Sequence, residues 1–188
     1  MSDSSTALSA STGLPAGTWE IDVAHSSVGF TVRHLMVSKV RGQFTDFTAD
    51  IVTAEDPLQS TVSAVVQMAS VDTRDENRDQ HLRTNDFFDV ENHPTMTFTS
   101  TGLSGSDGNY RLAGDLTIRG ITKPVTFDLE VGGLQKDPWG NTKAGFEATA
   151  TISRKDWGLE YNAVLETGGV MVGDKVTIEI DVEAALKA

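Results

Sequence analysis

The sequence predicts an all-β fold, an antiparallel up-and-down barrel of about eight strands with short helical insertions. Apolar and polar residues alternate in successive runs almost to the end of the chain, as in strands that bury one face. Clusters of Gly, Pro, Asn and Asp separate runs at 104–108 and 136–141. A single sheet of this width tends to curl, and closure removes its exposed edges. A two-sheet sandwich is the structural alternative.

The alternation also indicates which residues of each predicted strand face inward. Later runs repeat the pattern of the first: Val28, Phe30, Val32 and His34; Val62, Ala64, Val66 and Met68; Tyr110, Leu112, Leu116 and Ile118; Val125, Phe127, Leu129 and Val131; Phe146, Ala148, Ala150 and Ile152; Val176, Ile178, Ile180 and Val182. The strand from Gly42 to Ile51 is less regular, because Phe44 and Phe47 share a face only if a bulge separates them.

Residues 72–90 form a short insertion that interrupts the strands. Thr73 and Glu76 have the spacing of a capping box, which predicts that a short polar helix begins there. Asp79 and Arg83 lie four residues apart, so we expect them to form an ion pair on the helix surface. A second short insertion is predicted at 154–170, between the last two strands.

One edge of the first insertion combines polar and apolar groups. Arg78, His81 and Leu82 share a helix face, and Phe87 and Phe88 follow shortly after. A guanidinium and an imidazole beside apolar side chains suit an anionic or carbonyl head group on a hydrophobic tail. The alternative is a surface helix whose charges are solvated and whose phenylalanines plug the end of the barrel.

Length and composition indicate one domain without an obvious targeting segment. The 188 residues are predicted to form a flexible polar tail over residues 1–16 and a single β-barrel domain over residues 17–188. The first residues have neither a basic start nor a long apolar core, so no signal peptide is recognised. Cytoplasmic residence is therefore the default expectation.

The charge balance limits the partners that we expect. The net charge of −12 disfavours nucleic acid and anionic membrane surfaces, since carboxylates repel phosphate groups. No stretch is long enough for a transmembrane helix, so stable membrane anchoring is not expected. Cysteine is absent, which excludes disulfides, thiolate nucleophiles and cysteine-based zinc sites. None of these features excludes a lipid carried inside the fold.

Sequence motifs for metal binding and catalysis are also lacking. The four histidines, His25, His34, His81 and His93, show none of the common metal-ligand spacings. His34 continues an apolar face, so we expect it to be buried and hydrogen-bonded. No G-x-S-x-G, P-loop or dinucleotide-binding motif occurs. We therefore predict no catalytic residues, no metal and no cofactor; an enzyme with His34 or His81 as general base is the remaining catalytic alternative.

A series of short motifs carries a family resemblance. In order, they are Trp19-Glu-Ile-Asp22, His25-Ser26, Phe30-x-Val32-x-His34, Gly42-x-Phe44, Arg78-Asp79-x-His81-Leu82, Asp86-Phe87-Phe88-Asp89, Pro94-x-Met-x-Phe98, Leu116-Thr-Ile-x-Gly-Ile-Thr-Lys-Pro124-Val, Arg154-x-Asp156-Trp-Gly158 and Val172-Gly-Asp174-x-Val176. From Gly17 to Ala185 the chain resembles the YceI-like family, a lipocalin-like group described as polyisoprenoid-binding. The resemblance implies an antiparallel barrel that binds a long isoprenoid or other amphipathic chain in its lumen. Many members carry a secretion signal, which is not recognised here.

These observations lead to the hypothesis of a non-enzymatic lipid carrier. The inward faces and the helix edge supply the predicted ligand-binding residues: Val28, Phe30, Val32, His34, Val66, Met68, Arg78, His81, Leu82, Phe87, Phe88, Phe98 and Phe146. The alternative is a packed barrel that acts through its surface as an interaction or stress-associated module, because periodicity does not distinguish a packed core from a lined cavity. Exposed strand edges or the two insertions could also pair two barrels into a homodimer.

Overall fold

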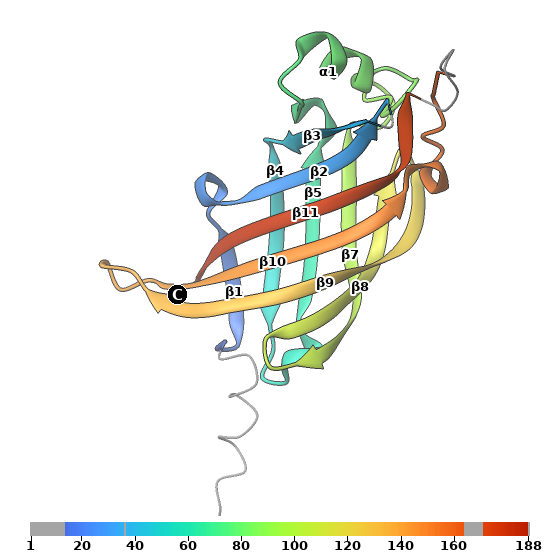
Figure 1. Ribbon diagram of the computed structural model, residues 1–188. Helices are drawn as coiled ribbons and strands as arrows, with labels where there is room; N and C mark the ends of the chain where they lie inside the picture. The colour runs from blue at the N-terminus through green and yellow to red at the C-terminus, as the bar shows by residue number, and fades with distance from the viewer. Residues whose placement is uncertain (1–13, 36, 164–170, 188) are drawn as a thin grey trace, which may run out of the picture.

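The computed structural model describes residues 14–35, 37–163 and 171–187, and it contains a closed antiparallel barrel (Figure 1). Within the described residues, the ring consists of β1 (Gly17–Ile21), β4 (Phe47–Thr53), β5 (Thr61–Gln67), β7 (Thr95–Ser106), β8 (Asn109–Ile118), β9 (Ile121–Lys136), β10 (Thr142–Ser153) and β11 (Val172–Leu186). Pairing of β1 with β11 closes it. The predicted barrel is confirmed, and the alternative of a sandwich is wrong.

Three further strands extend the sheet beyond this ring. β2 (Ser27–His34) pairs with β11, β3 (Ser38–Phe44) pairs with β2, and the short β6 (Val71–Asp72) pairs with the end of β3. β11 is therefore shared, because one part of it pairs with β1 and another with β2. The 3-10 helix η1 (Val23–His25) lies between β1 and β2, where the chain changes its direction along β11.

Polar side chains fix this junction. Asp22 caps η1, since its Oδ1 accepts a hydrogen bond from the Ala24 N–H at 3.1 Å. The Ser26 hydroxyl donates to the Asp22 carbonyl at 2.7 Å and accepts from the Glu183 N–H at 3.1 Å. The Asp22 N–H in turn donates to the Glu183 carbonyl at 2.8 Å. The His25-Ser26 motif thus belongs to the seam where the barrel closes.

The predicted single strand from Gly42 to Ile51 is wrong. β3 ends at Phe44 and β4 begins at Phe47, so the two phenylalanines belong to different strands, and both are buried. Thr45 and Asp46 form the break, where their N–H groups donate to the Ser70 carbonyl at 3.3 Å and the Ser70 hydroxyl at 3.1 Å. This hydrogen bonding replaces the ladder and allows both rings to point inward without a bulge.

Helix α1 (Glu76–Arg83) forms where it is predicted, but a different residue caps it. The cap is Asp75, whose carboxylate accepts from the Arg78 N–H at 3.1 Å. The predicted capping box of Thr73 and Glu76 is wrong, because the Thr73 hydroxyl is used elsewhere. A negative carboxylate at this position also interacts favourably with the positive, N-terminal end of the helix dipole.

The expected ion pair between Asp79 and Arg83 is also wrong. Asp79 is buried and accepts hydrogen bonds from both the hydroxyl and the N–H of Thr73, at 2.5 and 2.9 Å. Arg83 instead lies 3.6 Å from Glu76 and donates to the Ala69 carbonyl at 3.1 Å. A buried carboxylate needs close donors, and Thr73 supplies two of them.

Helix α1 and the segment that follows it lie over one end of the barrel (Figure 1). Leu82, Phe88 and Val90 pack against the main core cluster, and the Phe88 ring lies 6.0 Å from that of Phe44. On the neighbouring side, the buried Trp157 of η4 (Arg154–Trp157) donates its indole N–H to the Leu116 carbonyl at 3.0 Å. Apolar side chains therefore close this end.

The ends of two predicted segments lie outside the described residues. This applies to residues 1–13 of the predicted tail and to residues 164–170 of the second insertion. Leu14 is described and buried, in the cluster that includes Trp19, and the Pro15 carbonyl accepts from the Thr53 hydroxyl at 2.7 Å. Across the described parts of the chain, no helix has the length and apolar character needed to span a membrane.

Candidate functional site

A cavity of about 180 Å³ lies inside the barrel. Its lining comes from every strand of the ring and from β2, and it is dominated by inward-facing apolar side chains. They include Ile21, Val28, Phe47, Ile51, Val62, Ala64, Val66, Met96, Phe98, Leu103, Leu112, Leu116, Phe127, Leu129, Val131, Phe146, Ala148, Ile178, Ile180 and Val182. No charged residue lines the cavity in the described part of the chain. The lumen is therefore suited to an uncharged, apolar guest.

The cavity exists because small residues face inward near the middle of the barrel. Ala49 of β4, Ala64 of β5 and Phe98 of β7 are cross-strand neighbours, so two methyl groups lie beside one aromatic ring. The Phe98 ring lies over Gly114, where a Cβ atom would lie 2.3 Å from it, and contacts Phe127 edge-to-face at 5.3 Å. Small side chains leave space that the surrounding strands, fixed by their ladders, do not fill.

The cavity extends toward the barrel end opposite α1. There it is lined by the connection between β4 and β5, through Ala54, Pro57 and Ser60, and by Leu14. This connection contains the 3-10 helix η2 (Pro57–Gln59), and Figure 1 shows it at the opposite end from α1. We call the lining residues of this connection the mouth of the lumen.

The structure separates the predicted ligand-binding residues into groups. Val28, Val66, Phe98 and Phe146 line the cavity. Another group packs in or against the main core cluster: Phe30, Met68, Leu82 and Phe88. Phe87 is buried, with its ring 5.1 Å from His81 and 5.2 Å from Tyr161. Val32 and His34 are half-buried near the end of β2, so the expectation of a buried His34 is wrong.

Arg78 and His81 are both held by neighbouring residues of the insertion. The Arg78 guanidinium donates to the hydroxyl and the carbonyl of Thr73, both at 2.7 Å. Nε2 of His81 lies 2.8 Å from Asp86, and its ring contacts Tyr161 at 4.9 Å. Neither side chain belongs to the lining of the cavity. Arg78 therefore stabilises the insertion from within, and His81 connects it to Tyr161 of the second insertion.

Several lining residues were not among the predicted ligand contacts, although the sequence contained the signal for them. Leu112, Phe127, Ile178 and Ile180 all lie on inward faces that the alternation identified. Leu103 did not appear in a regular run, because the pairing of β7 with β8 shifts register between Ser100 and Gly102. A bulge of this kind moves a side chain to the other face.

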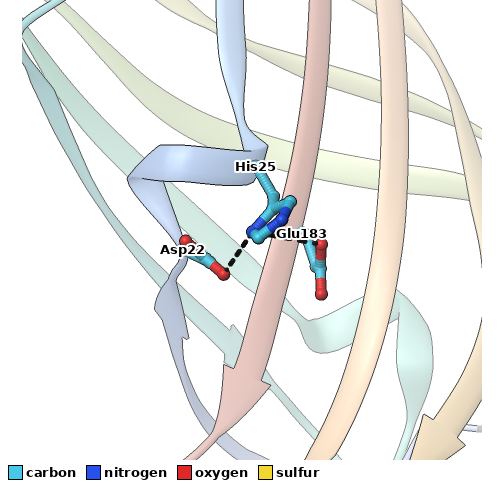
Figure 2. Close-up of side chains that lie close together, drawn as sticks. All are labelled: Asp22, His25 and Glu183. Atoms are coloured by element: carbon cyan, nitrogen blue, oxygen red, sulfur yellow. Dashed lines mark hydrogen bonds and ion pairs between the residues drawn. The ribbon is translucent and has the colours of Figure 1, made fainter. Parts of the chain in front are cut away.

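A separate polar cluster lies at the closure seam (Figure 2). Asp22, His25 and Glu183 each bring a potential metal-ligand atom within 4.8 Å of the others. His25 Nδ1 is 2.8 Å from Asp22 Oδ2, and the Lys143 ammonium lies 3.3 Å from Glu183 and 3.8 Å from Asp22. The carboxylates therefore already share a cation supplied by the chain, and the cluster acts as an ion-pair network across η1, β10 and β11.

This network shifts the ionisation of its members. The hydrogen bond to Asp22, and then the charges of Asp22 and Glu183, raise the pKa of His25 above its ordinary value of 6.5. The same hydrogen bond, reinforced by the charge of His25, holds the pKa of Asp22 below 3.8. Because the pKa of His25 rises on folding, its stabilising contribution is complete below pH 6.5 and is lost as pH increases through the raised value. The Asp22 contribution is present above pH 3.8 and is lost as pH falls.

We expect an NMR titration of the His25 imidazole to give a pKa above 6.5 in the folded protein. Asp22→Asn should lower this pKa, since it removes the main hydrogen-bond partner and its charge. Lys143→Met should raise it further, because the nearby ammonium opposes protonation of His25. A His25 pKa that is the same in all three proteins would show that the network does not form in solution.

The fold and the cavity place the protein in the class of closed antiparallel β-barrels whose interior retains an apolar space instead of being filled by side chains. The family model described as YceI-like domain matches residues 19–184, and the chain belongs to this family. It is 39% identical over 170 residues to a UPF0312 protein of Staphylococcus epidermidis, covering 89% of this chain and 97% of the relative. A UPF0312 protein of Staphylococcus aureus strain MW2 is 40% identical over 169 residues, with 88% and 95% coverage.

Solved structures show the same architecture. A Campylobacter jejuni YCEI protein is 32% identical, with a TM-score of 0.72 and coverage of 89% of this chain and 96% of that protein. BcnA of Burkholderia cenocepacia superposes with a TM-score of 0.76 at 23% identity, covering 87% and 99%. A domain of Saccharophagus degradans, described as polyisoprenoid-binding, has a TM-score of 0.67 at 16% identity, covering 90% and 98%. At these two lower identities the likeness shows the fold alone.

Proposed function

We propose that the protein binds a long-chain isoprenoid or a similar amphipathic lipid in its lumen and carries it without chemical change. The observation that carries this proposal is the cavity, which all strands of the ring line with apolar side chains and none with a charge in the described residues. Family membership supports it, and the Saccharophagus degradans domain of the same fold is described as polyisoprenoid-binding.

The size of the cavity suggests how such a ligand would lie. An engineered protein cavity of about 150 Å³ holds benzene, so about 180 Å³ accommodates a short apolar segment. The rest of a longer chain would extend through the mouth or displace lining side chains. Burial contributes roughly 0.8 kcal/mol per methylene, so each five-carbon isoprene unit would add on the order of 4 kcal/mol. Tight binding therefore needs few polar contacts.

Native mass spectrometry of the purified protein, followed by solvent extraction, tests this function. We expect a stoichiometric adduct whose extracted lipid shows an isoprenoid mass series, because a ligand enclosed in an apolar lumen survives purification. If the protein is recovered without ligand, candidate isoprenoids are added and the measurement is repeated. Failure of all of them to bind would contradict the proposal and favour a barrel that acts through its surface.

A carrier and an enzyme that acts on the bound lipid differ in what happens to the lipid during incubation. His34 and His81 are the two candidate general bases, but neither lines the cavity. We therefore expect the extracted lipid to be chemically identical before and after prolonged incubation with the protein. Turnover that His34→Ala or His81→Ala abolishes, with binding retained, would establish an enzyme instead.

A further inference from the structure

The turn between β2 and β3 exposes two apolar side chains to solvent. Val37 is 82% exposed and Leu35 is 40% exposed. Leu35 also adopts a left-handed backbone conformation with a φ of 54°, which a bulky side chain rarely takes. Its N–H donates to the Met171 carbonyl at 2.8 Å, so the turn is fixed in this conformation. Glycine or a polar residue would suit such a turn better, and the fold therefore does not explain these apolar side chains. We call Leu35 and Val37 the tip.

Four exposed cations lie next to the tip, on the outer face of the sheet. Arg33 and Lys39 are directly opposite each other on β2 and β3, a pairing of like charges that destabilises a sheet. Arg41 lies two residues further along β3, and its partner Thr31 precedes Arg33 by two residues, so all three cations point to the same side. Lys175 of β11 lies two residues before the partner of Thr31 and also points outward. We call Arg33, Lys39, Arg41 and Lys175 the cationic patch.

The surrounding protein does not neutralise the cationic patch. Within the described residues, no carboxylate forms an ion pair with any of its four members. The neighbouring Asp174 lies instead 3.8 Å from Arg154 and 3.5 Å from Lys155. Residues 23–45 contain no Asp or Glu, although the chain has 27 of them. The positive charge collected here therefore opposes the stability of the sheet and does not contribute to it.

The carboxylates of the first insertion, which lies at the same end of the barrel, are partly offset by cations of that insertion. Glu76 lies 3.6 Å from Arg83, and Asp86 lies 2.8 Å from His81. Asp79 is buried. These groups therefore weaken the positive potential of the cationic patch less than their number suggests.

Negative charge replaces positive charge further along the same outer face. The exposed Glu179 of β11 is the partner of Gly29 on β2, and the exposed Asp181 lies opposite Glu147 of β10. Figure 1 shows the carboxyl end of β2, which leads into the tip, at the barrel end that carries α1. A long polyanion lying along this face would be repelled by the carboxylates, whereas a flat surface would meet the tip and the cationic patch first. The charge pattern therefore favours a planar anionic partner.

We propose that the tip and the cationic patch together dock the protein reversibly on an anionic lipid bilayer. The cations attract the anionic head groups, and the apolar side chains of the tip enter the interface between head groups and acyl chains. The net charge of −12 disfavours such a surface as a partner of the whole molecule. Distant carboxylates are screened, however, because the Debye length is about 8 Å at physiological salt. Docking at this end leaves the mouth free at the opposite end, so the inference does not depend on whether the lumen holds a ligand.

Co-sedimentation with lipid vesicles tests this inference. At about 0.1 M salt, where the Debye length is about 10 Å, the protein should bind vesicles of phosphatidylcholine that contain about 30% phosphatidylglycerol and should not bind phosphatidylcholine alone. At about 1 M salt the binding should be lost. Lys39→Gln combined with Arg41→Gln should lower the apparent affinity about 25-fold, since each basic residue near an anionic surface contributes about fivefold. Val37→Ser should lower it several-fold, because it removes an apolar contact with the interface.

Matched controls lie at the other end of the barrel. Lys136→Gln combined with Lys187→Gln removes the same charge from two exposed positions, one at the end of β9 and one after β11. Trp139→Ser removes an apolar side chain that is 84% exposed, in the turn between β9 and β10. All of these proteins should bind the anionic vesicles as the unchanged protein does, and thermal unfolding should show that every variant is folded.

Three outcomes would overturn the inference. Equal effects of the two double substitutions would show that net charge matters and the cationic patch does not. Equal binding to both kinds of vesicle, or binding to neither, would exclude docking on an anionic bilayer. Retention of a single-stranded RNA in place of the vesicles would make the cationic patch a nucleic-acid site. Lumen binding is measured separately by lipid extraction, so none of these results decides the proposed function.

Discussion

Replacing Ala64 with Leu is expected to lower the affinity for a lumen ligand about thirty-fold while the barrel stays folded. Ala64 lies at the middle of β5, lines the cavity and has Ala49 and Phe98 as cross-strand neighbours. The added carbons would occupy space that two to three methylenes of the ligand need. At roughly 0.8 kcal/mol each, the loss is about 2 kcal/mol.

Ser63→Leu is the control for this variant. Ser63 is the preceding residue on β5 and faces outward, so the same side chain is added without entering the lumen. Its ligand affinity should equal that of the unchanged protein in a calorimetric titration. Thermal unfolding should show that Ala64→Leu retains its stability, because it fills an existing cavity. Unchanged binding by Ala64→Leu would place the ligand somewhere other than the lumen.

Arg154→Ala is expected to destabilise the protein by about 3 to 5 kcal/mol, because unsatisfied buried acceptors cost roughly 1 to 3 kcal/mol each. The Arg154 side chain is 4% exposed and donates to the carbonyls of Gly173, Leu159, Tyr161 and Val172. Burial lowers its pKa, although a guanidinium remains charged at physiological pH. Its loss would leave several carbonyl groups unsatisfied between η4 and the start of β11.

Lys155→Ala provides the comparison. Lys155 is adjacent in sequence and lies 3.5 Å from Asp174, but its side chain is 52% exposed. An exposed ion pair of this kind contributes roughly 0 to 1 kcal/mol to stability, so the free energy of unfolding measured with urea should barely change. The free energy of unfolding of Arg154→Lys should remain well below that of the unchanged protein, because an ammonium does not reproduce the planar set of guanidinium donors. Equal stability of Arg154→Ala and Lys155→Ala would contradict the structural role of the buried guanidinium.

The alternation of the strands predicted much of the candidate site. Val28, Val66, Phe98 and Phe146 were identified as inward-facing, and all four line the cavity. The prediction succeeds because successive side chains of a strand point to opposite faces, which is a property of the local backbone.

The helical insertion was predicted less well. A shared helix face placed Arg78 and His81 together, but Thr73 and Asp86 are the groups that they contact. Spacing along a helix shows which side chains are neighbours on its surface. It does not show whether that surface faces a ligand, solvent or the loop before the helix, since this depends on how the helix packs.

The sequence by itself determined the all-β class, the inward faces and the motifs of the YceI-like family, because each depends on local periodicity or on residues in order. Only the tertiary structure decided that the ring closes through β1 and β11, and that small side chains meet to leave a cavity. Closure and empty volume depend on residues from all strands together, and pairing of distant strands brings those residues into contact.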